Sequence, residues 1–351
     1  MKVLFITEWY PNERDPQLGV FIQKHARAVS QYHDVTVLSV SKDRPIFESK
    51  DFTVHHFRLN PLARLSFSNF FTRPPVDPDA FDIVHVHVAT SMVARLLKRS
   101  RVPMIISEHW SGYVDGRFDA LAQAEKDQRL ALLRSAKRIT AVSEILAESI
   151  HQCTNIRGIR VVPNVIEASE QQHPEKHPRV TALMVADIAD DIKNVSGVIE
   201  AMGRTKLDIE LHIIGDGPDM ELMQHLAAED DRISFLGRLA NEDVLKYMSR
   251  CHFLIVNSYV ETFSMVTAEA ILAGLPVIAT HCGGPEMFVN ESTGILIPVN
   301  DPEQLKNAIE KMYDTHPQYD LTHMQNDIAR SCNRTSVGKQ FSDLYEEVVN
   351  S

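Results

Sequence analysis

This 351-residue chain has few cysteines. It has no long apolar run, and its first residues do not resemble a secretory signal peptide. No segment approaches the roughly 18 apolar residues that a membrane-spanning helix needs. Glu8 interrupts the first apolar stretch, so no secretory leader is predicted. The cysteines are too far apart in sequence to suggest a disulfide framework or a thiolate zinc site; they are Cys153, Cys251, Cys282 and Cys332. These absences predict a cytoplasmic protein.

Charge is distributed unevenly along the chain. The formal net charge is -11, yet residues 1–165 hold 22 Lys+Arg and 17 Asp+Glu, whereas residues 166–351 hold 14 and 30. The basic half is suited to an anionic membrane surface or a phosphate-bearing acceptor. Its densest cluster consists of Arg95, Lys98, Arg99 and Arg101. Cations at a solvated helix C-terminus explain this cluster equally well, so both interpretations stay open.

Short apolar runs alternate with helical or loop-like stretches, which is typical of doubly wound parallel sheets. Two sets of predicted strands follow each other along the chain. The first is Val3–Ile6, Val35–Val40, Ile83–Val88, Met104–Ile106, Ile139–Val142 and Arg160–Val162. The second is Val180–Val185, Leu211–Ile214, Ile233–Leu236, Phe253–Val256, Val277–Thr280 and Ile295–Ile297. We therefore predict an α/β protein with two Rossmann-like domains, 1–166 and 167–330, divided in the polar segment 167–178.

Two glutamates, Glu261 and Glu269, stand on either side of a predicted helix start. The strand Phe253–Val256 leads into a loop with the first glutamate, and the helix begins near Met265 with the second about a turn inside it. Backbone N–H groups at a helix start point outward with the positive end of the macrodipole and favour phosphate. A diphosphate linking two polyols fits this layout. Two solvated surface charges are the plain alternative.

This segment resembles the donor-binding signature of the retaining, GT-B-fold glycosyltransferases of family four, also called glycosyl transferases group 1. The resemblance covers nearly the whole chain and is sharpest over Phe253–Glu286. It implies that the parallel sheets of the two domains face a central cleft. It also implies that a C-terminal helix, within 331–351, returns to the first domain. The family mechanism implies retention at the anomeric carbon by same-face attack, with the leaving diphosphate as base and no metal.

The resemblance also implies roles for individual residues. Glu261 contacts hydroxyls of the transferred sugar, and Glu269 holds the ribose hydroxyls of the nucleotide. His109, which follows the strand Met104–Ile106, matches a histidine that faces the transferred sugar, although a lone histidine is more often structural. His109 and Glu261 are therefore the expected catalytic residues. The expected ligands of the donor diphosphate are Lys193 and the segment Phe263, Ser264, Met265 and Val266.

The chain departs from the family pattern at two places. Gly19 stands alone where a glycine pair often approaches the donor phosphate, and a plain turn explains it equally well. Asp187 occupies the place of an arginine that helps to neutralise the diphosphate, so one cation is missing and Arg238 is the expected replacement. A weakened or inactive family member therefore stays open.

Two further features of the sequence resemble known ligand sites but have plainer explanations. Gly215 and Gly217 resemble the family turn near the nucleotide base, although a tight turn needs no ligand. His85 and His87 share one face of a predicted strand, yet no third metal ligand is near them in sequence. We therefore predict no metal site.

The expected function is transfer of a hexose-type sugar from a nucleotide-diphosphate sugar, with a UDP-sugar favoured, to a saccharide or lipid-linked acceptor. Such enzymes build cell-surface polysaccharide or lipopolysaccharide at the inner membrane face. No cofactor and no nucleic-acid partner are expected. One alternative is a nucleotide-sugar 2-epimerase of the same architecture, against which the spacing of the glutamates argues. The other is a non-catalytic two-lobed sugar-binding protein, against which the missing export signal counts.

Overall fold

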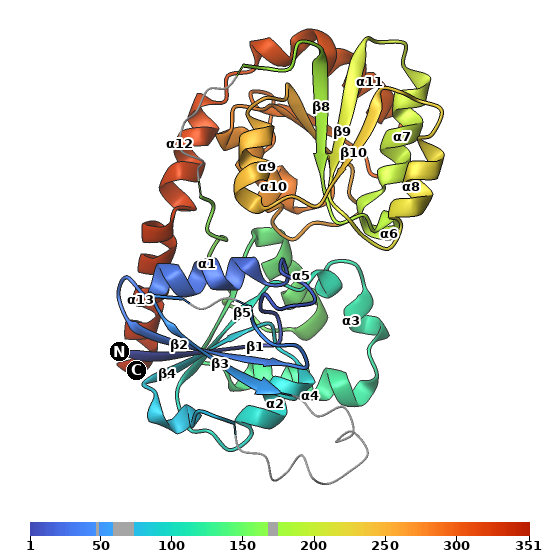
Figure 1. The fold of residues 1–351 in the computed structure, drawn as a ribbon. Coiled ribbons are helices and arrows are strands. Elements are labelled where there is room, and N and C mark those ends of the chain that lie inside the picture. Colours follow the sequence, from blue (N-terminus) through green and yellow to red (C-terminus); the bar gives the residue numbers. More distant parts are fainter. Residues whose placement is uncertain (47–48, 59–73, 168–174) are drawn as a thin grey trace. The chain divides into compact units, whose positions relative to one another are not determined.

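The computed structural model describes residues 1–46, 49–58, 74–167 and 175–351 (Figure 1). They form two compact units, Met1–Val165 with Ser331–Ser351, and Ile166–Arg330. The boundary was predicted between residues 166 and 167. Most of the polar segment on which that prediction rested, residues 168–174, lies outside the described residues.

The first unit is built on a seven-stranded parallel sheet with the order β3-β2-β1-β4-β5-β6-β7. Its central strands are buried on both faces and therefore read as continuous apolar runs. The strands are β1 Lys2–Thr7, β2 Asp34–Ser41, β3 Thr53–Arg58, β4 Ile83–His87, β5 Met104–Glu108, β6 Arg138–Ala141 and β7 Arg160–Val161. Strand β3 was not predicted, because this half-buried edge strand carries a mixed polar sequence without an apolar run.

Helices of the first unit join these strands. They are α1 Val20–Val29, α2 Ser91–Leu97, α3 Arg117–Ala120, α4 Gln123–Ser135, α5 Glu144–Thr154 and α13 Arg334–Val349, with short 3-10 turns η3 Pro78–Ala80 and η4 Ser111–Tyr113. Side chains cap the starts of three of them, because Thr90 accepts from the Val93 N–H, Ser143 from the Leu146 N–H and Asn333 from the Ser336 N–H. The basic cluster predicted from the sequence lies at and just beyond the C-terminal end of α2, where cations are favoured.

The last helix, α13, belongs to the first unit and packs along α1 (Figure 1). Gly338 makes this close approach possible, since a Cβ there would lie 2.3 Å from the Ala28 carbonyl oxygen. Phe341 and Tyr345 of α13 are fully buried in the core of this unit. The Tyr345 hydroxyl lies 2.7 Å from His85 Nδ1, so α13 also reaches the central strand β4.

The second unit is built on a six-stranded parallel sheet with the order β10-β9-β8-β11-β12-β13. The strands are β8 Val180–Val185, β9 Ile209–Ile214, β10 Ile233–Gly237, β11 Phe253–Val256, β12 Val277–Thr280 and β13 Gly294–Ile297. All six were predicted. The helices are α6 Asp190–Lys193, α7 Val195–Arg204, α8 Met220–Leu226, α9 Asn241–Met248, α10 Met265–Leu272, α11 Pro302–Thr315 and α12 Thr322–Ser331, with short 3-10 turns η5 Gly284–Met287 and η6 His316–Gln318.

Each sheet reverses its strand order once, at β1/β4 in the first unit and at β8/β11 in the second. Ligands of open α/β sheets bind outside the carboxyl ends of the strands at such a reversal. The predicted site residues His109, Lys193 and Glu261 all follow strands that lie at or next to these points. Among the described helices, none combines the length and apolar composition needed to cross a bilayer.

Candidate functional site

Glu261 lies on the loop that follows β11, and its backbone is fixed by the loop that follows β12. The Glu261 N–H donates to the Cys282 carbonyl at 2.8 Å, and the Gly284 N–H donates to the Glu261 carbonyl at 2.8 Å. The Ser258 hydroxyl donates to Glu261 Oε1 at 2.9 Å. The main chain of Glu261 is therefore held by the loop after β12, and its carboxylate is held by Ser258 of its own loop.

Lys193, at the end of α6, is the second ligand of that carboxylate. Its Nζ donates to Glu261 Oε1 at 2.6 Å, and the exposed fractions of the two side chains are 23% and 15%. Burial lowers the pKa of Lys193, but the charge and hydrogen bond of Glu261 raise it by more, so the pKa lies above its usual value. The ammonium group therefore stays charged at neutral pH.

Helix α10 carries the second glutamate. Ser264 precedes it with φ 61 and ψ 72, a left-handed conformation that is uncommon for a residue other than glycine, and its hydroxyl pairs with that of Thr267 at 2.8 Å. Glu269 lies in the buried part of the helix and is 6% exposed. The N–H groups of Met265 and Val266 belong to the first turn, where a helix offers donors to an anion.

Close packing of loops accounts for several glycines of the second unit. A Cβ on Gly284 would lie 2.4 Å from the carbonyl carbon of Phe263, so the Gly283–Gly284 loop rests directly on the residue that leads into α10. The Phe263 ring itself packs on Phe288 with ring centroids 5.2 Å apart, which leaves the backbone of Phe263 as the part available to a donor.

Gly215 and Gly217 are also required by packing. A Cβ on Gly215 would lie 1.8 Å from the Ala186 carbonyl oxygen, and one on Gly217 would lie 2.4 Å from that of Ile188. The loop that carries Asp187 therefore crosses directly over the turn after β9. These glycines have a structural reason, and their contact with a nucleotide base stays a prediction.

Asp187 and Arg238 form an ion pair with 3.5 Å between Oδ1 and the guanidinium Nη2. Asp187 is 72% exposed and Arg238 is 39% exposed, so the pair lies at the surface. The cation that was expected to replace the missing arginine is thus partly neutralised by the aspartate that stands in its place. Asp187 also acts on Lys193, where its charge helps to raise the pKa.

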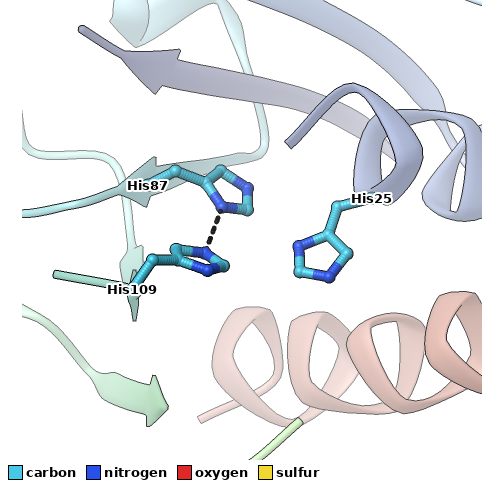
Figure 2. Close-up of side chains that lie close together, drawn as sticks. All are labelled: His25, His87 and His109. Atoms are coloured by element: carbon cyan, nitrogen blue, oxygen red, sulfur yellow. Dashed lines mark hydrogen bonds between the residues drawn. The ribbon is translucent and has the colours of Figure 1, made fainter. Parts of the chain in front are cut away.

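His109 follows β5 and lies in a cluster of buried histidines in the first unit. His109 Nε2 lies 3.2 Å from Nδ1 of His87 on β4, and His25 of α1 faces both rings (Figure 2). The Phe21 ring packs on His109 with centroids 4.4 Å apart. Burial lowers the pKa of His25 to about 4 and lowers those of His87 and His109 well below their usual value. All three are neutral imidazoles at pH 7.

Two matching family models decide the identity of the chain. The model "Glycosyltransferase Family 4" matches residues 19–170, and the model "Glycosyl transferases group 1" matches residues 179–315. The chain belongs to glycosyltransferase family four. The family predicted from the sequence is thereby confirmed.

Relatives and solved structures agree with this assignment. An uncharacterized glycosyltransferase of Methanocaldococcus jannaschii is 27% identical over 244 residues, which cover 67% of this chain and 66% of that protein. The N-acetyl-alpha-D-glucosaminyl L-malate synthase of Bacillus anthracis is 27% identical over 167 residues, which cover 45% of this chain and 43% of that enzyme. The structure of Anabaena HepE in complex with UDP superposes with a TM-score of 0.77 at 17% identity, covering 99% of this chain and 100% of that one. The predicted GT-B fold is confirmed.

The predicted site residues of this glycosyltransferase fall into groups within each unit. In the second unit, Lys193 and Glu261 are in contact, while Arg238 pairs with Asp187. In the first unit, Gly19 begins α1 with φ 66, and a Cβ there would lie 2.2 Å from the Trp9 carbonyl oxygen. Packing therefore explains Gly19, whose contact with a donor phosphate stays a prediction.

Sequence reasoning missed Glu108 and Arg129, which support the loop that follows His109. Glu108 Oε1 accepts from the Ala89 N–H at 2.9 Å and from the Tyr113 hydroxyl at 3.3 Å, and burial raises its pKa to about 7. Arg129 donates to the Ala89 carbonyl at 2.8 Å and lies 4.4 Å from the Trp110 ring centroid, in cation–π contact. A charged residue directly after an apolar strand was the available signal for Glu108.

Proposed function

We propose that this family-four protein is a retaining glycosyltransferase that moves a hexose-type sugar from a nucleotide-diphosphate sugar to a saccharide or lipid-linked acceptor. The observation that carries the proposal is the contact of Lys193 with Glu261, which places a charged lysine and a fixed carboxylate together beyond the carboxyl ends of the second sheet. HepE, a protein of the same fold, has been solved with UDP and with UDP-glucose, which supports a UDP-sugar as donor.

The proposed role of the second unit is to bind the donor and stabilise its leaving group. Lys193 and the N–H groups of Met265 and Val266 bind the diphosphate, where negative charge develops as the glycosidic bond breaks. Glu261 accepts hydrogen bonds from sugar hydroxyls, and Glu269 accepts them from the ribose. The oxygen of the acceptor hydroxyl attacks the anomeric carbon on the face from which the diphosphate leaves, and its proton passes to the departing phosphate oxygen. No step uses a metal ion.

In the first unit, the proposed role of His109 is a hydrogen bond to the hexose. Its imidazole is neutral because burial lowers its pKa, so it orients the sugar without adding charge. His87 Nδ1 holds the ring through the 3.2 Å contact with His109 Nε2. We further propose that the acceptor is an intermediate in the synthesis of cell-surface polysaccharide or lipopolysaccharide.

The decisive experiment compares Glu261→Gln with the wild type in transfer from UDP-hexoses. Removing one preorganised group of this kind lowers kcat by about 10²- to 10³-fold. A matched control is Glu200→Gln, which changes an exposed glutamate of the same unit whose partner is Arg204, and its activity stays at the wild-type level. Undiminished transfer by Glu261→Gln contradicts the assigned role.

Two further readouts of the same experiment test the donor and the stereochemistry. A thermal-shift series with UDP-, GDP- and ADP-sugars identifies the nucleotide, because a ligand that binds the folded state raises its stability. NMR of the product reports the anomeric configuration, which we expect to be that of the donor, in the presence of a chelator. An inverted product refutes the retaining mechanism.

A further inference from the structure

Three histidines from distant parts of the chain meet in the core of the first unit. His25 comes from α1, His87 from β4, and His109 from the loop after β5, and one ring nitrogen of each lies within 4.8 Å of the other two (Figure 2). His25 and His87 are fully buried, and His109 is 6% exposed. We propose that these three imidazoles form a binding site for a divalent transition-metal ion of the zinc class, which opposes sugar transfer when it is bound.

The distance between two of the rings suits a shared metal ion. His87 Nδ1 and His109 Nε2 lie 3.2 Å apart. Two nitrogens bound to one tetrahedral zinc ion at about 2.0–2.1 Å are separated by roughly 3.3 Å. The proton that joins these two nitrogens can therefore be replaced by an ion with little movement of either ring. His25 has to approach by a small shift to complete a set of three.

His25 is the ligand from α1, and both of its ring nitrogens are buried. Among the residues that the structure describes, neither of its ring nitrogens makes a hydrogen bond of normal geometry, although both are buried. The Pro163 carbonyl acts on the ring, since it offsets part of the fall in the pKa of His25. A backbone carbonyl that attracts one ring N–H leaves the lone pair of the other nitrogen for a metal ion. Figure 2 shows one ring nitrogen of His25 turned toward the other two rings.

His85 lies next to this cluster but is already occupied. Its Nδ1 pairs with the Tyr345 hydroxyl at 2.7 Å, and its Nε2 pairs with the Ser107 hydroxyl at 2.7 Å. Both nitrogens are thus used by hydroxyl groups, whereas Nδ1 of His87 faces another ring of the cluster, His109, and its Nε2 has no hydrogen-bond partner among the described residues. His85 and His87 stand two positions apart on β4 and are equally buried. This difference separates a satisfied core histidine from a proposed ligand.

The chemistry of the three side chains selects the class of ion. Imidazole nitrogens suit zinc, cobalt, nickel and copper, whereas magnesium and calcium prefer oxygen ligands. Three protein ligands leave a fourth position on a tetrahedral ion for water or an anion. The rings of Phe5, Phe21 and Phe341 pack on the cluster, so the ion would lie in a largely apolar surrounding. An anionic fourth ligand such as hydroxide reduces the cost of burying the charge there.

The effect on transfer rests on the proposed function, but the binding of the ion does not. In that proposal His109 gives a hydrogen bond to the hexose, and a metal ion would take the ring nitrogen that now faces His87. His109 is the only one of the three ligands with any exposed surface, so the ion and the sugar would both approach from its side. Zinc is therefore expected to inhibit an enzyme whose chemistry needs no metal.

The test begins with wild-type full-length protein freed of metal by a chelator. Titration with cobalt(II) is expected to give one ion per chain with the intense visible absorption of a tetrahedral site, and equimolar zinc removes that absorption. Magnesium has no effect. X-ray absorption of the zinc-loaded wild type is expected to show three imidazole ligands. Absence of tetrahedral cobalt, or fewer than three imidazoles on zinc, overturns the proposal without the need for any variant.

Matched substitutions locate the site. His25→Gln and His87→Gln are each expected to weaken zinc affinity by at least about 100-fold, as loss of a ligand does, while His85→Gln stays within threefold of the wild type. Binding that persists in the His25→Gln/His87→Gln double variant overturns the site. Zinc inhibition of transfer is measured separately. If zinc binds but transfer is unaffected, the metal site stands and its inhibition of transfer is refuted. If no donor sugar is ever transferred, the proposed function fails, and the binding measurements still decide whether the metal site exists.

Discussion

The candidate-site residues of the two units of this glycosyltransferase, His109 in the first and Lys193 in the second, have pKa values shifted in opposite directions. In the first unit, four histidines lie in the core, and burial is the largest cause that lowers the pKa of each. In the second unit, Lys193 is also largely buried, yet its contact with Glu261 raises its pKa. Desolvation acts in both units, and at Lys193 the nearby negative charges, Glu261 first, outweigh it.

This difference suits the two parts of the proposed donor. Neutral imidazoles can orient uncharged sugar hydroxyls by hydrogen bonds, whereas a charged lysine is needed to bind a diphosphate. The comparison teaches that one fold, used twice, can provide a neutral site and a charged site through the choice of partner alone. Three perturbations separate the two units experimentally.

Acid is expected to have the largest effect, and it acts on the first unit. The pKa of His25 is about 4 in the folded protein and 6.5 in the unfolded chain, so the unfolded state binds more protons between these values. The free energy of unfolding of metal-free protein therefore falls as pH drops through 6.5 and continues to fall to pH 4. His25 alone accounts for about 3 kcal/mol of this loss. Urea unfolding in the presence of chelator, from pH 7.5 to pH 4, measures it.

Glu108 provides the control, because its effect has the opposite sign. Its folded pKa of about 7 lies above its usual value of 4.5, so the folded state binds more protons in this window, and stability falls as pH rises through it. Glu108→Gln removes this opposing contribution. Its stability should depend on pH more steeply than that of the wild type, and an unchanged or flatter dependence contradicts the raised pKa of Glu108.

Breaking the charged pair of the second unit is expected to have the next largest effect. Lys193→Ala leaves the Glu261 carboxylate without its cation, although Ser258 still donates to it. Fully buried pairs cost 3–5 kcal/mol when one partner is removed, and partial exposure of this pair reduces the loss to about 2 kcal/mol. The control Lys246→Ala removes the partner of Asp243, and both side chains of that pair are about 60% exposed, so the loss stays below 1 kcal/mol. Equal losses in urea unfolding would show that Lys193 is an ordinary surface lysine.

The smallest expected effect concerns the surface pair of Asp187 and Arg238. Asp187→Asn changes stability by less than about 0.5 kcal/mol, because both side chains are well exposed. It also removes a negative charge next to Arg238 and Lys193, so the affinity for the donor diphosphate should rise by roughly threefold at low salt. Asp208→Asn, which removes a partner of Arg179 just before β9, leaves donor affinity unchanged. Calorimetric titration with UDP at two salt concentrations distinguishes the two variants.

Much of the fold was predictable because both sheets are parallel and their inner strands are buried on both faces. Such strands are continuous apolar runs, and β8 and β11 were recognised on that basis. Strand β3 escaped recognition, because an edge strand with two histidines and partial exposure lacks this pattern. Apolar sequence patterns indicate buried strands, and they predict a strand poorly where the strand is only partly buried.

The candidate site was predictable where a motif is local and not where it depends on distant segments. Glu261, Glu269 and the start of α10 lie within nine positions and were recognised together. The contact of Lys193 with Glu261 spans 68 positions, and only the family resemblance suggested that the two belong together. His25 lies on the buried face of α1, where spacing alone indicates a core residue. Its proximity to His87 and His109 required the folded chain.

The place of α13 has a consequence for the order in which this protein is made. The core of the first unit is completed by Val337, Phe341, Leu344, Tyr345 and Val348, which are synthesised after the whole of the second unit. The second unit is encoded entirely between the two segments of the first. During synthesis the second unit therefore has its full sequence available while the first still awaits its closing helix.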